Sequence, residues 1–69
     1  MTRVRNRLKE ILKEKGLTQS DLARAIGTDR SSVNRYAHGR TIPSFRTMSK
    51  IAKVLNEEVG NIFFVDDSA

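Results

Sequence analysis

Three glycines interrupt the first forty residues of this sequence, and each follows a segment with the apolar spacing of an amphipathic helix. They are Gly16, Gly27 and Gly39. Glycine tolerates the left-handed backbone conformation in which many helices end, so each is expected to close a helix and turn the chain. The sequence therefore predicts an all-α protein of short helices joined by tight turns.

The first two helices are predicted on either side of Gly16. Apolar residues recur at helical spacing from Arg3 to about Lys15, which predicts an amphipathic first helix. Thr18 is a good N-cap residue, and Asp21, three positions later, puts an acid at the positive end of the next helix. The second helix is therefore expected to run from about Gln19 to Ile26.

Three further helices are predicted after the second glycine. The third is expected to follow a Thr28 cap and to reach about His38. A loop containing Pro43 separates it from the fourth, for which Ser44 is the N-cap. A short fifth helix is expected around residues 58–63. The buried stripe of the fourth helix is expected to consist of Phe45, Met48, Ile51, Ala52 and Leu55.

The chain has no cysteine and one histidine, His38, so neither a disulfide framework nor a zinc cluster is available to stabilise it. Its 69 residues make a single domain, 1–69, and a domain this small depends on helix packing or on dimerisation. We expect residues 1–3 and 66–69 to fray. The sequence has no recognisable signal peptide or membrane-spanning run, which predicts a cytoplasmic protein without a membrane partner.

Positive charge is concentrated in the middle of the chain. The formal net charge is +5, and no acidic residue lies between Asp29 and Glu57. The basic residues of this interval are Arg30, Arg35, Arg40, Arg46, Lys50 and Lys53. From Glu57 onward the chain carries acids and no base. This distribution indicates one face suited to a polyanion such as nucleic acid and another face kept away from it.

The third predicted helix separates its side chains into two arcs when they are placed at about 100° per residue. Val33 and Tyr36 lie on the side that can dock onto the protein. The opposite arc carries Arg30, Ser31, Asn34 and Arg35. Arginine can contact guanine bidentately, asparagine can contact adenine, and the major groove of DNA admits a helix. The same arc can also be an ordinary solvated face, and composition alone gives the two interpretations equal weight.

A close crossing of the second and third helices favours the first interpretation. Ala23 is the small residue needed at such a crossing, Gly27 the turn, and Val33 the branched apolar residue under the later helix. The stretches that carry this pattern are TQSDLARAIGTDRSSVNRYAHG and PSFRTMSKIAKVLN. They resemble the helix-turn-helix family of phage lambda Cro and repressor, the XRE-like family, over about residues 8–63. The resemblance implies a compact five-helix DNA-binding domain and a bacterial or phage transcriptional repressor.

The resemblance also implies roles for individual residues. In related phage repressors the positions of Arg30, Ser31 and Arg35 read bases, and Asn34 lies on the same face. The expected phosphate contacts are Gln19, Thr28, Arg40, Thr41 and Arg46. The resemblance implies further that the protein binds as a homodimer to a palindromic operator in the double-stranded DNA of the nucleoid.

The sequence departs from this family at two places. Leu12 and Ala37 stand where relatives often have a buried arginine and glutamate, and an apolar pair can replace such an ion pair at little cost. Glu57 and Glu58 stand where relatives tend to have an apolar residue and a Ser or Thr cap. The start of the fifth helix is therefore the least determined of the helix boundaries.

The apolar tail exceeds what a core of this size can cover, which predicts a dimer interface. Its residues are Val59, Ile62, Phe63, Phe64 and Val65. Such a dimer can span two half-sites about one helical turn apart. A chain without a second domain has little room for a ligand pocket, so no cofactor, metal or small-molecule ligand is expected.

Other classes of function fit the sequence less well. An enzyme needs a positioned nucleophile, base and orienting group, and His38 has no evident partner. A protein-interaction module, such as an antitoxin or the partner of a larger regulator, is the main alternative, and Arg30 and Arg35 favour DNA over it. Sequence-specific RNA binding usually needs exposed aromatic residues, most of which are expected in the core here.

Overall fold

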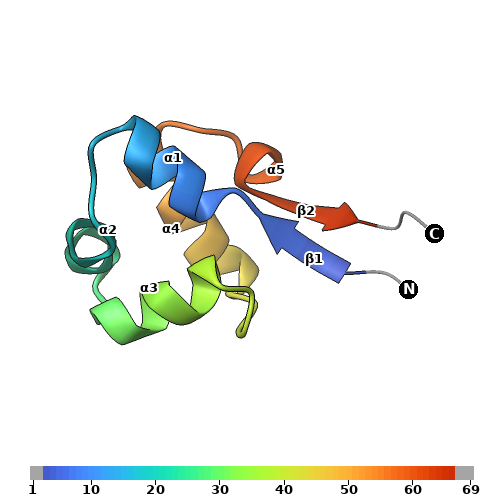
Figure 1. The fold of residues 1–69 in the computed structure, drawn as a ribbon, viewed down its shortest axis with the longest axis horizontal. Coiled ribbons are helices and arrows are strands. Elements are labelled where there is room, and N and C mark those ends of the chain that lie inside the picture. The colour runs from blue at the N-terminus through green and yellow to red at the C-terminus, as the bar shows by residue number, and fades with distance from the viewer. Residues whose placement is uncertain (1–2, 67–69) are drawn as a thin grey trace.

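The computed structural model describes residues 3–66 and shows five helices and one two-stranded antiparallel sheet in that part of the chain (Figure 1). In chain order the elements are β1 (Arg3–Asn6), α1 (Leu8–Glu14), α2 (Gln19–Ile26), α3 (Arg30–Ala37), α4 (Phe45–Leu55), α5 (Val59–Ile62) and β2 (Phe63–Asp66). The expected five-helix fold is confirmed, and the strand pair adds a feature that the sequence did not predict. None of the described helices is long and apolar enough to cross a membrane.

α2 begins and ends as predicted. Thr18 closes a capping box: its Oγ1 accepts a hydrogen bond from the Asp21 backbone N–H at 3.0 Å, and its own N–H donates to Asp21 Oδ2 at 2.9 Å. Gly27 ends the helix with a φ of 78°, in the left-handed region that disfavours residues with a side chain. The chain therefore turns directly from α2 into the segment that leads to α3.

The cap of α3 is Asp29, and the predicted cap Thr28 is wrong. Asp29 Oδ1 accepts a hydrogen bond from the Ser32 backbone N–H at 2.8 Å. A carboxylate carries a full negative charge to the positive end of the helix, so it satisfies this position better than a hydroxyl. Ser44 caps α4 as predicted, because its Oγ accepts from the Thr47 backbone N–H at 3.2 Å.

The two capping carboxylates predict a loss of stability in acid. The backbone N–H of Thr18 holds the pKa of Asp21 below its usual value, and the backbone N–H of Ser32 does the same for Asp29. Because these pKa values are lower in the folded protein, the stabilisation is complete above about pH 4, where unfolded aspartates titrate, and is lost as the pH falls through the folded values. We expect the urea midpoint to decrease below about pH 4.

The matched control for this prediction is the double variant Asp21→Asn, Asp29→Asn, which keeps oxygen acceptors at both caps but cannot titrate there. Its urea midpoint should decrease less in acid than that of the parent protein. Identical pH profiles for the parent and the double variant would show that the caps do not contribute to the acid dependence.

The helices enclose one apolar core, in which α2 packs against both α3 and α4. The buried core residues are Leu8, Ile11, Leu12, Leu22, Ala23, Ile26, Val33, Ile51, Ala52, Leu55, Ile62 and Phe63. Leu12 belongs to this core and Ala37 packs against it, which fits an apolar replacement of the ion pair found in relatives.

The predicted burial of Phe45 is wrong, since its side chain is 74% exposed. Exposure decreases along α4 from Phe45, through the half-buried Met48, to the fully buried Ile51. The first turn of α4 therefore projects beyond the core, although Phe45 has the same helical spacing as the buried residues.

The first predicted helix is wrong at its start, because residues 3–6 form a strand. β1 pairs with β2 from the other end of the described chain, and the antiparallel register places Val4 opposite Val65 (Figure 1). Arg5 and Asp66 add an ion pair of 3.0 Å across this ribbon. The backbone of residues 3–6 thus makes its hydrogen bonds to β2 and not within a further turn of α1. The apolar pattern of these residues could not show this, because β2 lies at the other end of the described chain.

Asn6 marks the change from the ribbon to the helices. Its Oδ1 accepts a hydrogen bond from the Leu8 backbone N–H at 3.0 Å, at the start of α1. Its Nδ2 donates to the Tyr36 carbonyl oxygen in α3 at 2.9 Å. One side chain therefore links β1, α1 and α3, and fixes where the ribbon leaves the helical body.

The chain ends are more ordered near the ribbon than the sequence indicated. Of the residues expected to fray, 1–2 and 67–69 lie outside the described part of the chain, whereas Arg3 and Asp66 form the outer pair of the ribbon. α5 is shorter than the predicted 58–63, because Phe63 already has extended backbone and belongs to β2.

Candidate nucleic-acid interface

α3 has one side on the core and one side in solvent. Val33 is fully buried beneath the helix, and Tyr36 packs partly buried against the core. The exposed side chains of the opposite side are Arg30, Ser31 and Arg35. Asn34, the fourth residue of the predicted arc, is half-buried. The helix therefore exposes three of the four predicted base-reading side chains to solvent.

The arc on α3 forms part of a concave surface that includes Arg40. Its lining residues are Arg30, Ser31, Asn34, Arg35 and Arg40, and its volume is about 510 Å³. Three guanidinium groups thus surround one shallow depression, and no carboxylate lines it. We call this surface the α3 depression. Its positive potential and its hydrogen-bond donors suit an anionic ligand with polar edges.

The turn after α3 brings Arg40 into this depression. The Arg40 backbone N–H donates to the Arg35 carbonyl oxygen at 3.0 Å, and the Gly39 N–H donates to the Tyr36 carbonyl oxygen at 3.1 Å. This double closure of a helix end requires a left-handed residue, and Gly39 has a φ of 71°. Gly39 therefore positions Arg40 at the α3 depression besides ending the helix.

The two arginines of α3 differ in how firmly they are held. Arg35 Nη2 donates to Ser32 Oγ at 3.2 Å, one turn earlier on the same helix. The side chain of Arg30 makes no hydrogen bond or ion pair with any described residue. Ser32 was not identified from the sequence, although its spacing of three residues from Arg35 was a usable signal. Arg35 is therefore partly oriented before a ligand arrives, and Arg30 is free to reorient.

Gln19 and Asn34 form a contact between α2 and α3 that the sequence analysis did not identify. Asn34 Nδ2 donates to Gln19 Oε1 at 3.1 Å, and both residues are half-buried. The side-chain oxygen Oδ1 and the second N–H of Asn34, and the amino group of Gln19, are not used by this bond. The arrangement holds Gln19, the first residue of α2, beside the reading side of α3.

The other predicted phosphate-contacting side chains lie on the segments that flank α3 in the chain and at the start of α4. Thr28 is exposed just before α3, Thr41 in the connection to α4, and Arg46 in the first turn of α4. The structure thus places Thr28 and Thr41 in solvent on the segments before and after α3, and Arg46 in solvent on α4. Only Arg40 among the predicted phosphate contacts lines the α3 depression itself.

The five residues predicted at the dimer interface are divided between core and surface. Ile62 and Phe63 are buried in the core of the subunit, with 0% and 6% exposure, and Val59 packs against it half-buried. Phe64 and Val65 are exposed on β2. The apolar tail thus contributes Val59, Ile62 and Phe63 to the core. Only Phe64 and Val65 remain exposed for contacts with another molecule.

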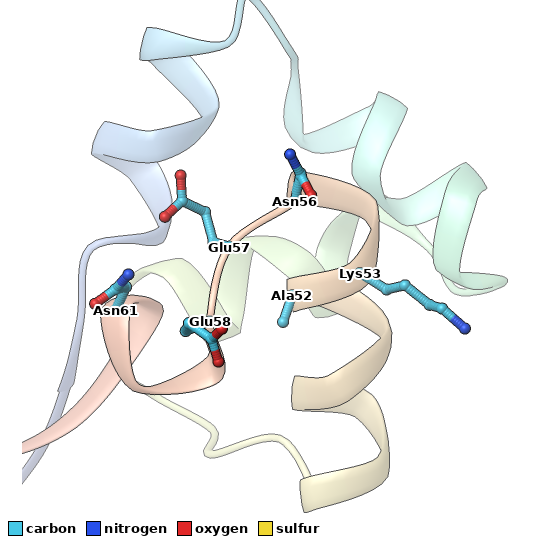
Figure 2. A pocket seen from close by; sticks show the side chains of 6 residues that line it. All are labelled: Ala52, Lys53, Asn56, Glu57, Glu58 and Asn61. Carbon is cyan, nitrogen blue, oxygen red and sulfur yellow. The ribbon is translucent and has the colours of Figure 1, made fainter.

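An acidic surface lies at the junction of α4 and α5, shown in Figure 2. A pocket of about 320 Å³ there is lined by Ala52, Lys53, Asn56, Glu57, Glu58 and Asn61. Glu57 pairs with Lys15 at 3.4 Å, and the Lys53 side chain points away from both glutamates (Figure 2). Lys15 and Lys53 offset the two glutamates here, so this surface lacks the concentration of positive charge found in the α3 depression.

Comparisons with known proteins agree with this geometry. The sequence matches the family model described as Helix-turn-helix over residues 8–60. It is 34% identical over 64 residues to a protein of Archaeoglobus fulgidus named an uncharacterized HTH-type transcriptional regulator, covering 93% of this chain and 91% of that protein. It is 39% identical over 49 residues to the ImmF control region 10 kDa protein of Bacillus phage phi105, covering 71% of this chain and 54% of that protein. The relatives thus include an archaeal and a phage protein.

The fold also matches a solved structure of this kind. The restriction-modification controller protein C.AhdI from Aeromonas hydrophila superimposes with a TM-score of 0.74 at 36% identity, over 80% of each chain. The family is one of transcription regulators, which excludes the enzyme alternative. The chain therefore belongs to the XRE-type helix-turn-helix family and is a DNA-binding transcriptional regulator.

Proposed function

We propose that this protein is a transcriptional repressor that binds a palindromic operator as a homodimer, with α3 of each subunit in the major groove. It acts on DNA of the cytoplasmic nucleoid and needs no cofactor or small-molecule ligand. The observation that carries the proposal is the α3 depression, which three arginines and two polar side chains line together. Double-stranded DNA offers both the negative charge and the base edges that these groups require.

The side chains of the α3 depression have distinct roles in this proposal. Arg30 and Arg35 contact guanine O6 and N7, and Ser31 donates to or accepts from a neighbouring base. Asn34 accepts from a base through its carbonyl oxygen while its amino group stays bonded to Gln19. The second N–H of Asn34 Nδ2 remains for a base, so the bond to Gln19 restricts the orientation of the Asn34 side chain without using up its hydrogen-bonding groups.

The phosphate contacts in this proposal come from the rim. Gln19 binds a phosphate with its amino group at the N-terminus of α2, where unpaired backbone N–H groups and the helix dipole favour an anion. Arg40 and Arg46 neutralise phosphates on the other side of the groove. Thr28 and Thr41 donate hydroxyl hydrogen bonds to the backbone. These contacts set the register of α3 on the duplex and are the same for every sequence.

Replacing Arg35 by alanine tests base reading directly. After the preferred site has been selected from a random DNA pool, Arg35→Ala should weaken binding to it by about 1–3 kcal/mol per half-site and relax the preference at one G·C pair. Binding to random DNA should weaken much less. The measurement is the dissociation constant on selected and random duplexes at one salt concentration.

Arg24→Ala is the matched control. It removes the same charge from the far part of α2, where Arg24 lines a different groove with Lys50, Lys53 and Val54. It should leave the ratio of specific to random affinity unchanged. Equal losses on both duplexes for Arg35→Ala would mean that Arg35 contacts only phosphate. A reporter gene carrying the selected site reports the sign of regulation, and activation there would refute the repressor role.

A further inference from the structure

A carboxylate stands at the start of the helix that is proposed to enter the major groove. Asp29 caps α3, and its Oδ1 accepts a hydrogen bond from the Ser32 backbone N–H at 2.8 Å. It is the one acidic residue between Asp21 and Glu57 in the sequence. A carboxylate there repels phosphate, and the uncharged asparagine caps a helix about as well. Capping alone therefore does not account for the charge of Asp29.

The same carboxylate begins a chain of contacts that ends at a predicted base-reading side chain. The backbone N–H of Ser32 lowers the pKa of Asp29 most, and the Ser32 hydroxyl and the positive charge of Arg35 lower this pKa further. Ser32 Oγ in turn accepts a hydrogen bond from Arg35 Nη2 at 3.2 Å. Consecutive members of the chain are three residues apart, so each lies beside the next on the helix surface.

We propose that Ser32, held by Asp29, is a positioning residue that keeps Arg35 in its base-reading conformation before DNA arrives. This inference rests on the proposed function, because it concerns how one base contact of α3 gains its selectivity. Neither Asp29 nor Ser32 contacts a base in this arrangement, and both act through the guanidinium of Arg35.

The bond to Ser32 sets the direction of the Arg35 side chain. Side chains on a helix point back toward its N-terminus, and residues near the N-terminus of a recognition helix are those that reach base edges. Because Ser32 lies one turn before Arg35, the bond keeps the guanidinium over the first half of α3. A guanidinium has five N–H donors and this bond uses one, which leaves the others for guanine O6 and N7.

The charge of Asp29 gives the Ser32 hydroxyl a defined role. A hydroxyl both donates and accepts, and its proton rotates to suit its surroundings. When Ser32 donates this proton to the Asp29 carboxylate, its lone pairs remain for Arg35. Hydrogen bonds in such a chain strengthen one another. The order of carboxylate, hydroxyl and guanidinium therefore favours one orientation of all three groups.

Arg30 is the internal comparison for this effect. It lines the α3 depression together with Arg35, but its side chain makes no hydrogen bond or ion pair with any described residue. Ordering a long side chain on binding weakens affinity by about 2- to 10-fold. Part of this ordering is complete for Arg35 in the free protein and has yet to occur for Arg30. The base pair that Arg35 contacts is therefore expected to be read more strictly.

Ser32→Ala tests the positioning role through base preference. The helix should remain intact, because alanine is the better helix former and the backbone N–H that donates to Asp29 is kept. We expect binding to the selected operator to weaken about 2- to 10-fold for each half-site, with little change on random DNA. Sites selected again from a random pool should lose preference at one base pair, the same pair that Arg35→Ala relaxes. Ser32→Thr keeps a hydroxyl and should restore this preference.

Ser49→Ala is the matched control, since Ser49 is also a half-buried serine within a helix and lies on α4. It should leave affinity and base preference unchanged. Ser32→Ala should have no further effect in a protein that already carries Arg35→Ala. An equal loss in both backgrounds would mean that Ser32 contacts DNA itself, and would overturn the positioning role.

Asp29→Asn separates the charge of the cap from its hydrogen bond. The variant keeps an oxygen acceptor for the Ser32 backbone N–H and no longer repels phosphate, so binding to random DNA should tighten. The preference at the base pair read by Arg35 should relax, because the Ser32 hydroxyl is held less firmly. The ratio of specific to random affinity therefore decreases. Equal gains on both duplexes with an unchanged selected site would overturn the role of Asp29.

Arginine side-chain NMR on the free protein tests the positioning without DNA. The order parameter of the Nε–Hε bond should be higher for Arg35 than for Arg30, and Ser32→Ala should lower it to the Arg30 value. Equal mobility of the two arginines in the parent protein would overturn the proposal, even if Ser32→Ala failed to fold. Loss of selective DNA binding by the parent protein would instead refute the proposed function, which this NMR measurement does not depend on.

Discussion

Operator affinity is expected to decrease about a thousandfold or more when the salt concentration rises from about 50 to about 200 mM. Each phosphate neutralised by a protein cation releases condensed counterions, so the equilibrium constant depends steeply on salt. In the proposed dimer, the exposed Arg40 and Arg46 of each subunit lie against the phosphate backbone, and the arginines of α3 add positive charge beside it. About six to ten neutralised phosphates per dimer account for the expected decrease.

The slope of log K against log salt concentration, from fluorescence anisotropy titrations, measures this effect. Arg40→Ala or Arg46→Ala should reduce the slope by about one unit for each phosphate that the variant no longer neutralises. Gln19→Ala removes a neutral phosphate ligand and should weaken binding to all sequences with little change in slope. A slope near zero for the parent protein would mean that phosphate neutralisation does not drive binding, and would contradict the DNA interface proposed around α3.

Leu22→Ala is expected to lower the free energy of unfolding by about 2–5 kcal/mol. Leu22 on α2 is fully buried in the core that α2, α3 and α4 share. Truncating a buried leucine loses the transfer free energy of the removed atoms and leaves a cavity. The free energy of unfolding of a protein is roughly 0.05–0.15 kcal/mol per residue, so it is small for a chain of this size. This single change therefore removes a large share of it.

Urea unfolding followed by circular dichroism measures this prediction. Val54→Ala is the control, because it removes apolar atoms from a partly exposed position on α4 and should cost no more than about 0.5 kcal/mol. DNA binding of Leu22→Ala should be lost in parallel with folding as temperature rises. A cost for Leu22→Ala as small as that for Val54→Ala would show that the α2 core is not tightly packed.

The sequence determined most of the helical framework because the signals involved are local. A capping box needs only Thr18 and Asp21, and a left-handed turn needs only a glycine such as Gly27. The spacing of Val33 against Arg30 and Arg35 fixes which side of α3 turns outward. Each of these features depends on residues a few positions apart, so the amino-acid sequence is sufficient to find it.

The tertiary structure decided the contacts between residues far apart in the chain. Arg5 and Asp66 are 61 positions apart, and no local pattern could show that the segments carrying them form a ribbon instead of helix and tail. The bond between Asn34 and Gln19 depends on how closely α2 and α3 cross. Phe45 has the periodicity of a core residue, yet it is exposed because the packed layer ends one turn later. Periodicity tells which side of a helix is apolar, whereas only the positions of the neighbouring elements decide how much of that side is covered.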